Sequence, residues 1–141
     1  MDRKDWTLLA IAAAKGEALD PAQLQKCLFV LGREFPGAVG SDFHAFRAYH
    51  YGPFAASVYR DAEQLEQEGL VTIAAGGSVR RFRATADGLR EARRLRREAP
   101  VDAVRYLEQI VEWARGLSFQ GLVRAIYAKY PEQRENSVFV G

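Results

Sequence analysis

The sequence predicts an α+β fold that is mostly helical, and three observations lead to this class. Over most of the chain, apolar residues recur every three or four positions, which is the spacing of helices with one buried face. Residues 70–73 instead have the composition of a strand and residues 79–84 alternate, on either side of the flexible turn Gly76-Gly77-Ser78, which indicates one β-hairpin. With 141 residues and a hydrophobic share of 48%, the chain suits a single domain with a proper core.

Two helices and a short strand are expected before residue 50. The first helix covers about Asp5 to Ala14. The second begins after Asp20-Pro21, a capping side chain followed by proline at the first helical position, and ends at Pro36-Gly37. The aromatic stretch from Phe43 to Tyr49 then has the composition of a short strand.

A third helix and the hairpin come next. Gly52-Pro53 is expected to open this helix, because proline fixes a helix-compatible φ, and Gly69 is expected to end it. The hairpin strands cover residues 70–73 and 79–84. Alternation in the second strand places its apolar side chains opposite to Arg81 and Arg83, so the hairpin has an arginine face.

Three more helices are expected after the hairpin. The fourth is capped by Thr85 or Asp87 and broken by Pro100, and the sixth begins after a Ser118 cap and ends at Pro131. The fifth, about Val101 to Arg115, has a second apolar stripe of Tyr106, Ile110 and Trp113. That stripe predicts either burial beneath the sixth helix or a homodimer formed through the C-terminal helices.

The order of helices, strand, helix and hairpin is the outline of a winged helix-turn-helix with a C-terminal helical extension. We therefore expect a winged-helix domain with the following basic helix over residues 1–99. A helical extension packed on it covers residues 100–131, and a loosely ordered tail covers residues 132–141. These parts together are expected to form one domain.

Several short motifs carry a resemblance to a known family. They are Leu24-Gln25-Lys26-Cys27-Leu28, Tyr51-Gly52-Pro53-Phe54, Gly69-Leu70 and Thr85-Ala86-Asp87-Gly88. In these positions the chain resembles bacterial and archaeal winged-helix domains with LQK and YGP(Y/F) signatures, and it is related in pattern to the Panacea antitoxin domain. The resemblance implies a winged-helix fold and, through Panacea, an antitoxin-like role.

Composition excludes several function classes. One cysteine, Cys27, and two histidines, His44 and His50, predict no disulfide, no metal site and no cofactor. A charged N-terminus and the lack of an 18-residue apolar run predict a cytoplasmic protein without membrane contact. No glycine-rich phosphate loop, nucleophile turn or pair of catalytic carboxylates stands out, so we expect no catalytic residues and no enzyme.

Basic residues concentrate after the hairpin turn. Residues 80–97 hold eight arginines against two acidic residues, although the formal net charge of the whole chain is only +2. Guanidinium groups pair with phosphates, so this segment predicts contacts to a nucleic-acid backbone through Arg80, Arg81, Arg83, Arg90, Arg94 and Arg97. A solvated basic helix balanced by acidic neighbours remains the alternative.

The third helix is acidic, which argues against insertion into a phosphate-lined groove. It has four acidic residues, Asp61, Glu63, Glu66 and Glu68, against one basic residue, Arg60. Only its first turn is therefore suited to approach the bases of a duplex, and Arg60 and Ser57 are the candidates for base contact. The leading prediction is a transcriptional regulator that binds double-stranded DNA. The alternative is an antitoxin-like or adaptor module that covers a partner protein such as a toxin, through Tyr51, Tyr59, Glu63 and Glu66.

Overall fold

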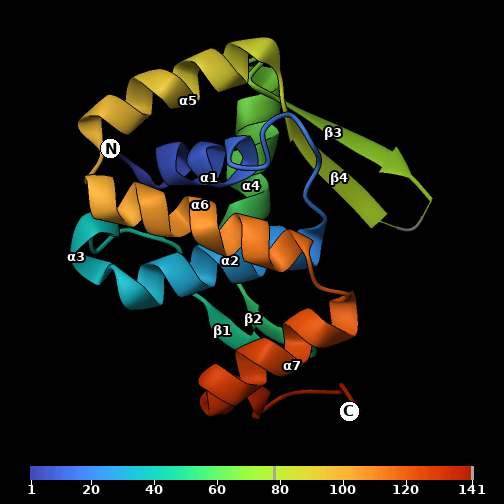
Figure 1. Ribbon diagram of the computed structural model, residues 1–141. Coiled ribbons are helices and arrows are strands. Elements are labelled where there is room, and N and C mark those ends of the chain that lie inside the picture. Colours follow the sequence, from blue (N-terminus) through green and yellow to red (C-terminus); the bar gives the residue numbers. More distant parts are fainter. Residues whose placement is uncertain (78, 141) are drawn as a thin grey trace.

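The computed structural model describes residues 1–77 and 79–140. Within those residues the chain forms seven α-helices, one 3-10 helix and two separate antiparallel hairpins (Figure 1). The predicted class, α+β and mostly helical, is therefore confirmed. Ser78 of the expected turn and Gly141 at the end of the tail lie outside the described residues.

The first two helices are fixed by capping boxes at their amino ends. Helix α1 (Arg3–Ala12) begins two residues earlier than expected, because Asp2 and Asp5 each accept the other's backbone N–H. Helix α2 (Pro21–Glu34) has the expected Asp20 cap, which is paired in the same way with Gln23. Cys27 lies on α2 and is buried in the core, as its position beside the apolar stripe predicts.

The segment after α2 differs from the expectation. A one-turn helix α3 (Pro36–Val39) precedes a short hairpin of β1 (Arg47–Tyr49) and β2 (Gly52–Phe54). Gly52-Pro53 therefore belongs to a strand and does not open the next helix, which is a correction. Gly52 has a φ of +110°, outside the helical region, and Pro53 is accepted because a two-stranded hairpin leaves its nitrogen unpaired.

Helix α4 (Ala56–Gln67) ends at the expected glycine, Gly69, and leads into the second hairpin. This hairpin pairs β3 (Val71–Gly76) with β4 (Val79–Ala84) and extends away from the helices (Figure 1). As predicted, Phe82 is buried while Arg81 is exposed. Leu19, between α1 and α2, exchanges two backbone hydrogen bonds of 2.9 Å with Phe82, so it adds a third short segment beside β4.

The C-terminal part contains α5 (Ala86–Glu98), α6 (Val101–Arg115), α7 (Phe119–Lys129) and a 3-10 helix (Pro131–Arg134). Thr85 and Ser118 cap α5 and α7 as expected. The tail is more ordered than predicted. The reason is that it lies along the first hairpin, where the Val138 N–H donates to the carbonyl of His50 and the Asn136 amide donates to Ala48.

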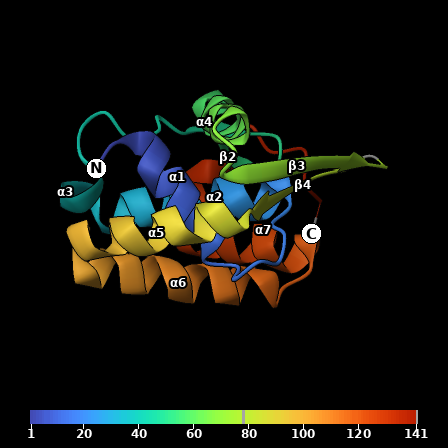
Figure 2. The ribbon, with the colours of Figure 1, turned by 90° about the horizontal axis from the view of Figure 1, so that it is seen from above.

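The helices stack around α1 and α2. Figure 2 shows α4 and α6 on opposite sides of the molecule, where α4 packs on α1 and α6 packs on α2, while α5 packs on α1. Fully buried side chains from several elements form one core: Trp6, Leu24, Leu28, Phe82, Leu95 and Leu107. In the second stripe of α6, Tyr106 packs against Phe35, but Trp113 stays 41% exposed, so this stripe is only partly covered. The homodimer stays a prediction.

Candidate nucleic-acid interface

A basic hollow of 540 Å³ lies at the amino end of α4. Its arginines come from three elements: Arg3 from α1, Arg47 from β1 and Arg60 from α4. Ala55 at the N-cap position offers no capping oxygen, so the first N–H groups of α4 add partial positive charge. We call this site the α4 hollow, and its character suits an anion.

An aromatic row connects this hollow to the second hairpin. Tyr49 lies 5.5 Å from Phe54, and Phe54 lies 5.7 Å from Tyr59, measured between ring centroids. The Arg80 guanidinium then lies over Tyr59, 4.5 Å from its ring centroid. Phe54 and Tyr59 are half-buried and Tyr49 is exposed, so the row is partly accessible along its length.

The row does not include Tyr51, which the protein-partner alternative had selected. Tyr51 lies in the turn between β1 and β2 and is 46% exposed. Its ring packs edge to face on Phe119 of α7, at 5.3 Å. Tyr51 and Tyr59 therefore contact different elements.

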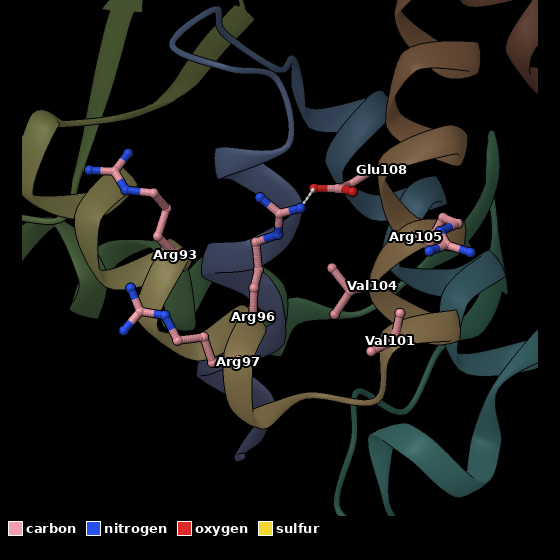
Figure 3. A pocket seen from close by; sticks show the side chains of 7 residues that line it. All are labelled: Arg93, Arg96, Arg97, Val101, Val104, Arg105 and Glu108. Carbon is pink, nitrogen blue, oxygen red and sulfur yellow. Dashed lines mark ion pairs between the residues drawn. The ribbon is translucent and has the colours of Figure 1, made fainter.

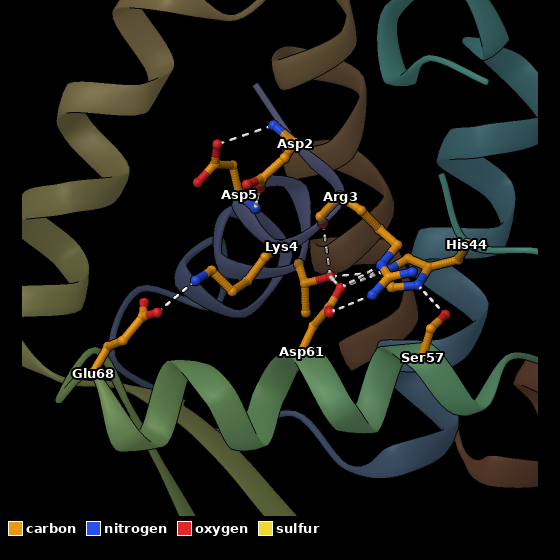
Figure 4. Close-up of polar contacts among 9 residues, drawn as sticks. Asp2, Arg3, Lys4, Asp5, His44, Ser57, Asp61 and Glu68 are labelled. Atoms are coloured by element: carbon orange, nitrogen blue, oxygen red, sulfur yellow. Dashed lines mark hydrogen bonds and ion pairs between the residues drawn. The ribbon is translucent and has the colours of Figure 1, made fainter. Parts of the chain in front are cut away.

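A buried polar cluster holds α4 against α1 (Figure 4). Asp61 accepts two hydrogen bonds from the Arg3 guanidinium, at 2.8 and 2.9 Å. The His44 ring lies between two hydroxyls, with Nε2 2.9 Å from Thr7 Oγ1 and Nδ1 2.6 Å from Ser57 Oγ. We call these five residues the α4 anchor.

The α4 anchor corrects one predicted site residue and explains the state of the histidine. Ser57, proposed for base contact, is buried and directs its hydroxyl inward to His44. Burial lowers the pKa of His44 to about 4, so the imidazole is neutral at pH 7. A neutral ring has one donor and one acceptor nitrogen, and the two hydroxyls satisfy both.

The α4 anchor contains serine, histidine and aspartate, which are the residue types of a hydrolase triad. Their hydrogen bonds, however, connect α4 to its neighbours and do not form the order of a triad. Asp61 lies 3.5 Å from His44 Nε2, which is the nitrogen that also faces Thr7, while Arg3 binds both carboxylate oxygens. A general base should have a pKa near the working pH, far above that of His44. The expectation that the chain is not an enzyme stays a prediction.

The acidic residues of α4 are balanced by groups outside the helix. Besides Asp61 in the anchor, Glu68 pairs with Lys4 of α1, and Glu63 lies 3.7 Å from Arg80. Glu66 accepts the backbone N–H of Ile73, at 3.1 Å. The negative charge counted in the sequence is therefore largely compensated in the fold.

The three hairpin arginines do not share one face. Arg80 lies on the same side as Phe82, over the aromatic row, whereas Arg81 is exposed on the opposite side. Arg83 also lies on that opposite side, where it donates to the carbonyl of Gly16, at 2.6 Å. Only Arg80 contacts α4.

The arginines of α5 are also divided. Arg90 pairs with Asp87, and Arg94 makes two hydrogen bonds of 2.7 Å to Glu91 and one of 3.0 Å to Glu98. The bond to Glu91 raises the pKa of Arg94 above its ordinary value. Arg97 has no ion-pair partner among the described residues and lines a second hollow, between α5 and α6.

Sequence reasoning missed Arg3 and Arg47 of the α4 hollow. Both lie far in sequence from the arginine-rich segment, and only the folded chain brings them to Arg60. Of the arginines that line the second hollow, Arg93 and Arg96 belong to the predicted basic segment but were not among the chosen phosphate contacts, and Arg105 was missed. Their helical spacing was the available signal, because Arg93, Arg96 and Arg97 share one side of α5.

Two findings on residues 1–77 and 79–140 concern a metal site and a membrane span. No group of three His, Cys, Asp or Glu side chains there could hold a metal ion. None of the helices in this part combines the length and apolarity needed to cross a membrane. No family model matches the chain, and no curated protein matches its sequence.

Proposed function

We propose that this chain is a winged-helix protein that binds double-stranded nucleic acid through α4 and the β3–β4 hairpin. The observation that carries the proposal is the α4 hollow, where Arg47 and Arg60 meet at the amino end of a helix. The aromatic row extends this surface to Arg80 on the hairpin. Phosphate contacts from the amino end of α4 and from the hairpin are a suitable arrangement for a duplex backbone.

The arrangement of elements supports the winged-helix part of the proposal. Helices α1, α2 and α4 pack together, and the β3–β4 hairpin extends beside α4 as a wing. The motifs of the resemblance to winged-helix domains with LQK and YGP(Y/F) signatures lie at the start of α2 and in β2, which directly precedes α4. A transcriptional regulator is the role that best suits this combination.

The ion pairs around α4 remove the main objection to nucleic-acid binding. An acidic helix repels phosphates, but Asp61 is neutralised by Arg3 within the anchor and Glu68 by Lys4. The side chains at the hollow are basic or uncharged. Electrostatics thus favours approach by the amino end of α4.

The same contacts make the antitoxin-like alternative weaker. It requires Glu63 and Glu66 to be available for a basic partner protein, with Tyr59 beside them. Glu66 accepts a backbone hydrogen bond, and Arg80 covers Tyr59 and approaches Glu63. No feature of the surface favours a toxin over nucleic acid, so we propose nucleic acid.

Binding of a fluorescent random-sequence duplex, followed by anisotropy over a range of salt concentrations, tests the proposal. Each lost phosphate contact lowers the magnitude of the slope of log affinity against log salt by about 0.9. We expect Arg47→Gln and Arg60→Gln each to reduce the slope by about that amount. Arg90→Gln is the matched control, because Arg90 already pairs with Asp87.

Two results would overturn the proposal. One is a wild-type protein that gives no salt-dependent change in anisotropy with the duplex. The other is a pair of folded Arg47→Gln and Arg60→Gln variants that bind like the Arg90→Gln control. A circular dichroism spectrum of each variant keeps misfolding separate from lost binding.

A further inference from the structure

A second basic site lies between α5 and α6, on the side of the molecule away from α4. Three adjoining hollows of 390, 290 and 520 Å³ share Arg96 and Glu108 in their walls. Helix α5 packs on α1 and α6 packs on α2, so the two helices leave a trough between them with α1 as its floor. We call this site the α5–α6 trough.

The mouth of the trough carries uncompensated positive charge. Arg93, Arg97 and Arg105 have no ion-pair partner among the described residues. Figure 3 shows Arg96 reaching across to Glu108, with Arg105 on the α6 side and with the Arg93 and Arg97 guanidinium groups directed away from Arg96. The Arg96–Glu108 distance is 3.1 Å, and it is the one ion pair across this mouth in the described part of the chain.

The floor of the trough is apolar. Leu9 of α1, Leu89 of α5, and Val104 and Leu107 of α6 line the middle hollow beneath the Arg96–Glu108 pair. Apolar walls with a few convergent charged groups are the usual features of small-molecule sites, and the volumes lie in the usual range. The trough is therefore amphipathic, with charged side chains at its mouth and apolar side chains on its floor.

The ion pair between Glu108 and Arg96 indicates which kind of anion would fit the trough. Its carboxylate already pairs with Arg96 at the mouth, so a ligand carboxylate that replaces it would find the same guanidinium. Arg93, Arg97 and Arg105 add positive charge to the surface around the mouth, which favours the approach of an anion. An uncharged or cationic molecule of the same shape would gain nothing from these arginines.

We propose that the α5–α6 trough binds a small organic carboxylate with an apolar tail, whose carboxylate pairs with Arg96 and whose tail lies against Leu89 and Val104. The ligand displaces the Glu108 side chain from Arg96. This site does not share residues with the α4 hollow, and the inference does not rest on nucleic-acid binding.

Isothermal titration of the full chain with decanoate, below its micellar concentration, tests the proposal. Acetate supplies the same head group without a tail, and decyltrimethylammonium supplies the tail with the opposite charge. We expect saturable binding of decanoate alone. Arg96→Gln should weaken decanoate about tenfold, the effect of losing one charged hydrogen-bonded pair.

The decisive comparison is between the two partners of the ion pair. Glu108→Gln removes the competing carboxylate and should tighten decanoate binding severalfold, whereas Arg96→Gln weakens it. A purely structural ion pair predicts no such opposite change, since both variants lose the same contact. Arg94→Gln is the control on α5, because Arg94 pairs with Glu91 and Glu98 outside the trough.

The proposal is wrong if decanoate does not bind, if acetate binds as tightly, or if the two variants change affinity in the same direction. In a separate competition experiment, displacement of decanoate by duplex DNA would also overturn it, because the trough would then belong to a nucleic-acid surface. The decanoate titration itself contains no DNA, so its failure would leave the proposed function of the α4 hollow unaffected.

Discussion

The two ends of α4 are attached to the rest of the molecule by different physical means. At the amino end, the α4 anchor buries Asp61 and Ser57 of α4 with His44. Further along the helix, Glu63 lies 3.7 Å from Arg80 and Glu68 pairs with Lys4, and all four side chains are partly exposed to solvent. Both regions use ion pairs, but only the first has a buried carboxylate, because Asp61 is 8% exposed while its partner Arg3 is 35% exposed.

This difference determines how much each end contributes to stability. The buried Asp61 carboxylate accepts two hydrogen bonds from the charged Arg3, and a hydrogen bond to a charged group contributes about 1.5–3 kcal/mol. An exposed pair is screened by water and salt and contributes a few tenths to about 1 kcal/mol. The amino end, where the candidate nucleic-acid interface lies, is therefore expected to be the more firmly positioned end.

Asp61→Ala should give the largest loss of stability. The substitution removes two hydrogen bonds between Asp61 and the charged Arg3 and leaves Thr7 and His44 without their acidic neighbour, so the free energy of unfolding should fall by about 3 kcal/mol. Urea unfolding followed by circular dichroism measures the change. Glu68→Ala on the same helix is the matched control, and an equal loss in both variants would remove the proposed difference between the two ends.

The second largest effect is expected at acidic pH, where protonation of His44 should lower the free energy of unfolding. The pKa of His44 is about 4 in the folded protein because of burial, while an unfolded histidine has a pKa of about 6.5. The unfolded state thus binds more protons between these values, and stability should fall by about 2–3 kcal/mol as pH decreases from 6.5 to 4. Unfolding curves at several pH values measure this slope.

A comparison of histidine variants separates this effect from other titrations. His44→Gln removes the buried group, so the slope of stability between pH 6.5 and 4 should become smaller than in the wild type. His50→Gln, at the exposed turn of the first hairpin, should keep the wild-type slope. A wild-type slope in the His44→Gln variant would show that another group causes the acid sensitivity.

The helices were predictable where the sequence contains their end signals. Asp20, Thr85 and Ser118 cap helices in the structure because each places an oxygen three residues before a free N–H. Gly52-Pro53 was misassigned because proline suits both a first helical turn and an unpaired strand position. Only the pairing with β1, which local sequence does not encode, distinguishes these alternatives.

The candidate site was less predictable than the fold. A count of charges in α4 indicated an acidic surface, but the compensating groups Arg3, Lys4 and Arg80 lie at least 17 positions away in sequence. The inward direction of Ser57 likewise depends on His44, which belongs to another segment. Side-chain partners set by tertiary contacts cannot be inferred from spacing within one helix.

Arg80→Gln should have an intermediate effect, since Arg80 links the hairpin to α4 without being buried. The guanidinium lies over Tyr59 and near Glu63, and its loss should cost about 1 kcal/mol of unfolding free energy. Urea unfolding measures it, with Arg81→Gln on the opposite face of the strand as the control. A larger loss in the Arg81→Gln variant would mean that the hairpin is held by its other face.

The smallest effect is expected for Lys4 and Glu68 at the carboxyl end of α4. Their hydrogen bond raises the pKa of Lys4 and lowers that of Glu68, so both are charged at neutral pH. Because both side chains are about one third exposed, a double-mutant cycle of Lys4→Met and Glu68→Gln should give a coupling of about 0.5 kcal/mol. The coupling should shrink further in 1 M salt, where charges beyond a few ångströms are screened. A coupling above about 2 kcal/mol that persists in salt would place this pair in the same class as Asp61 and Arg3, and the two ends of α4 would then be equally anchored.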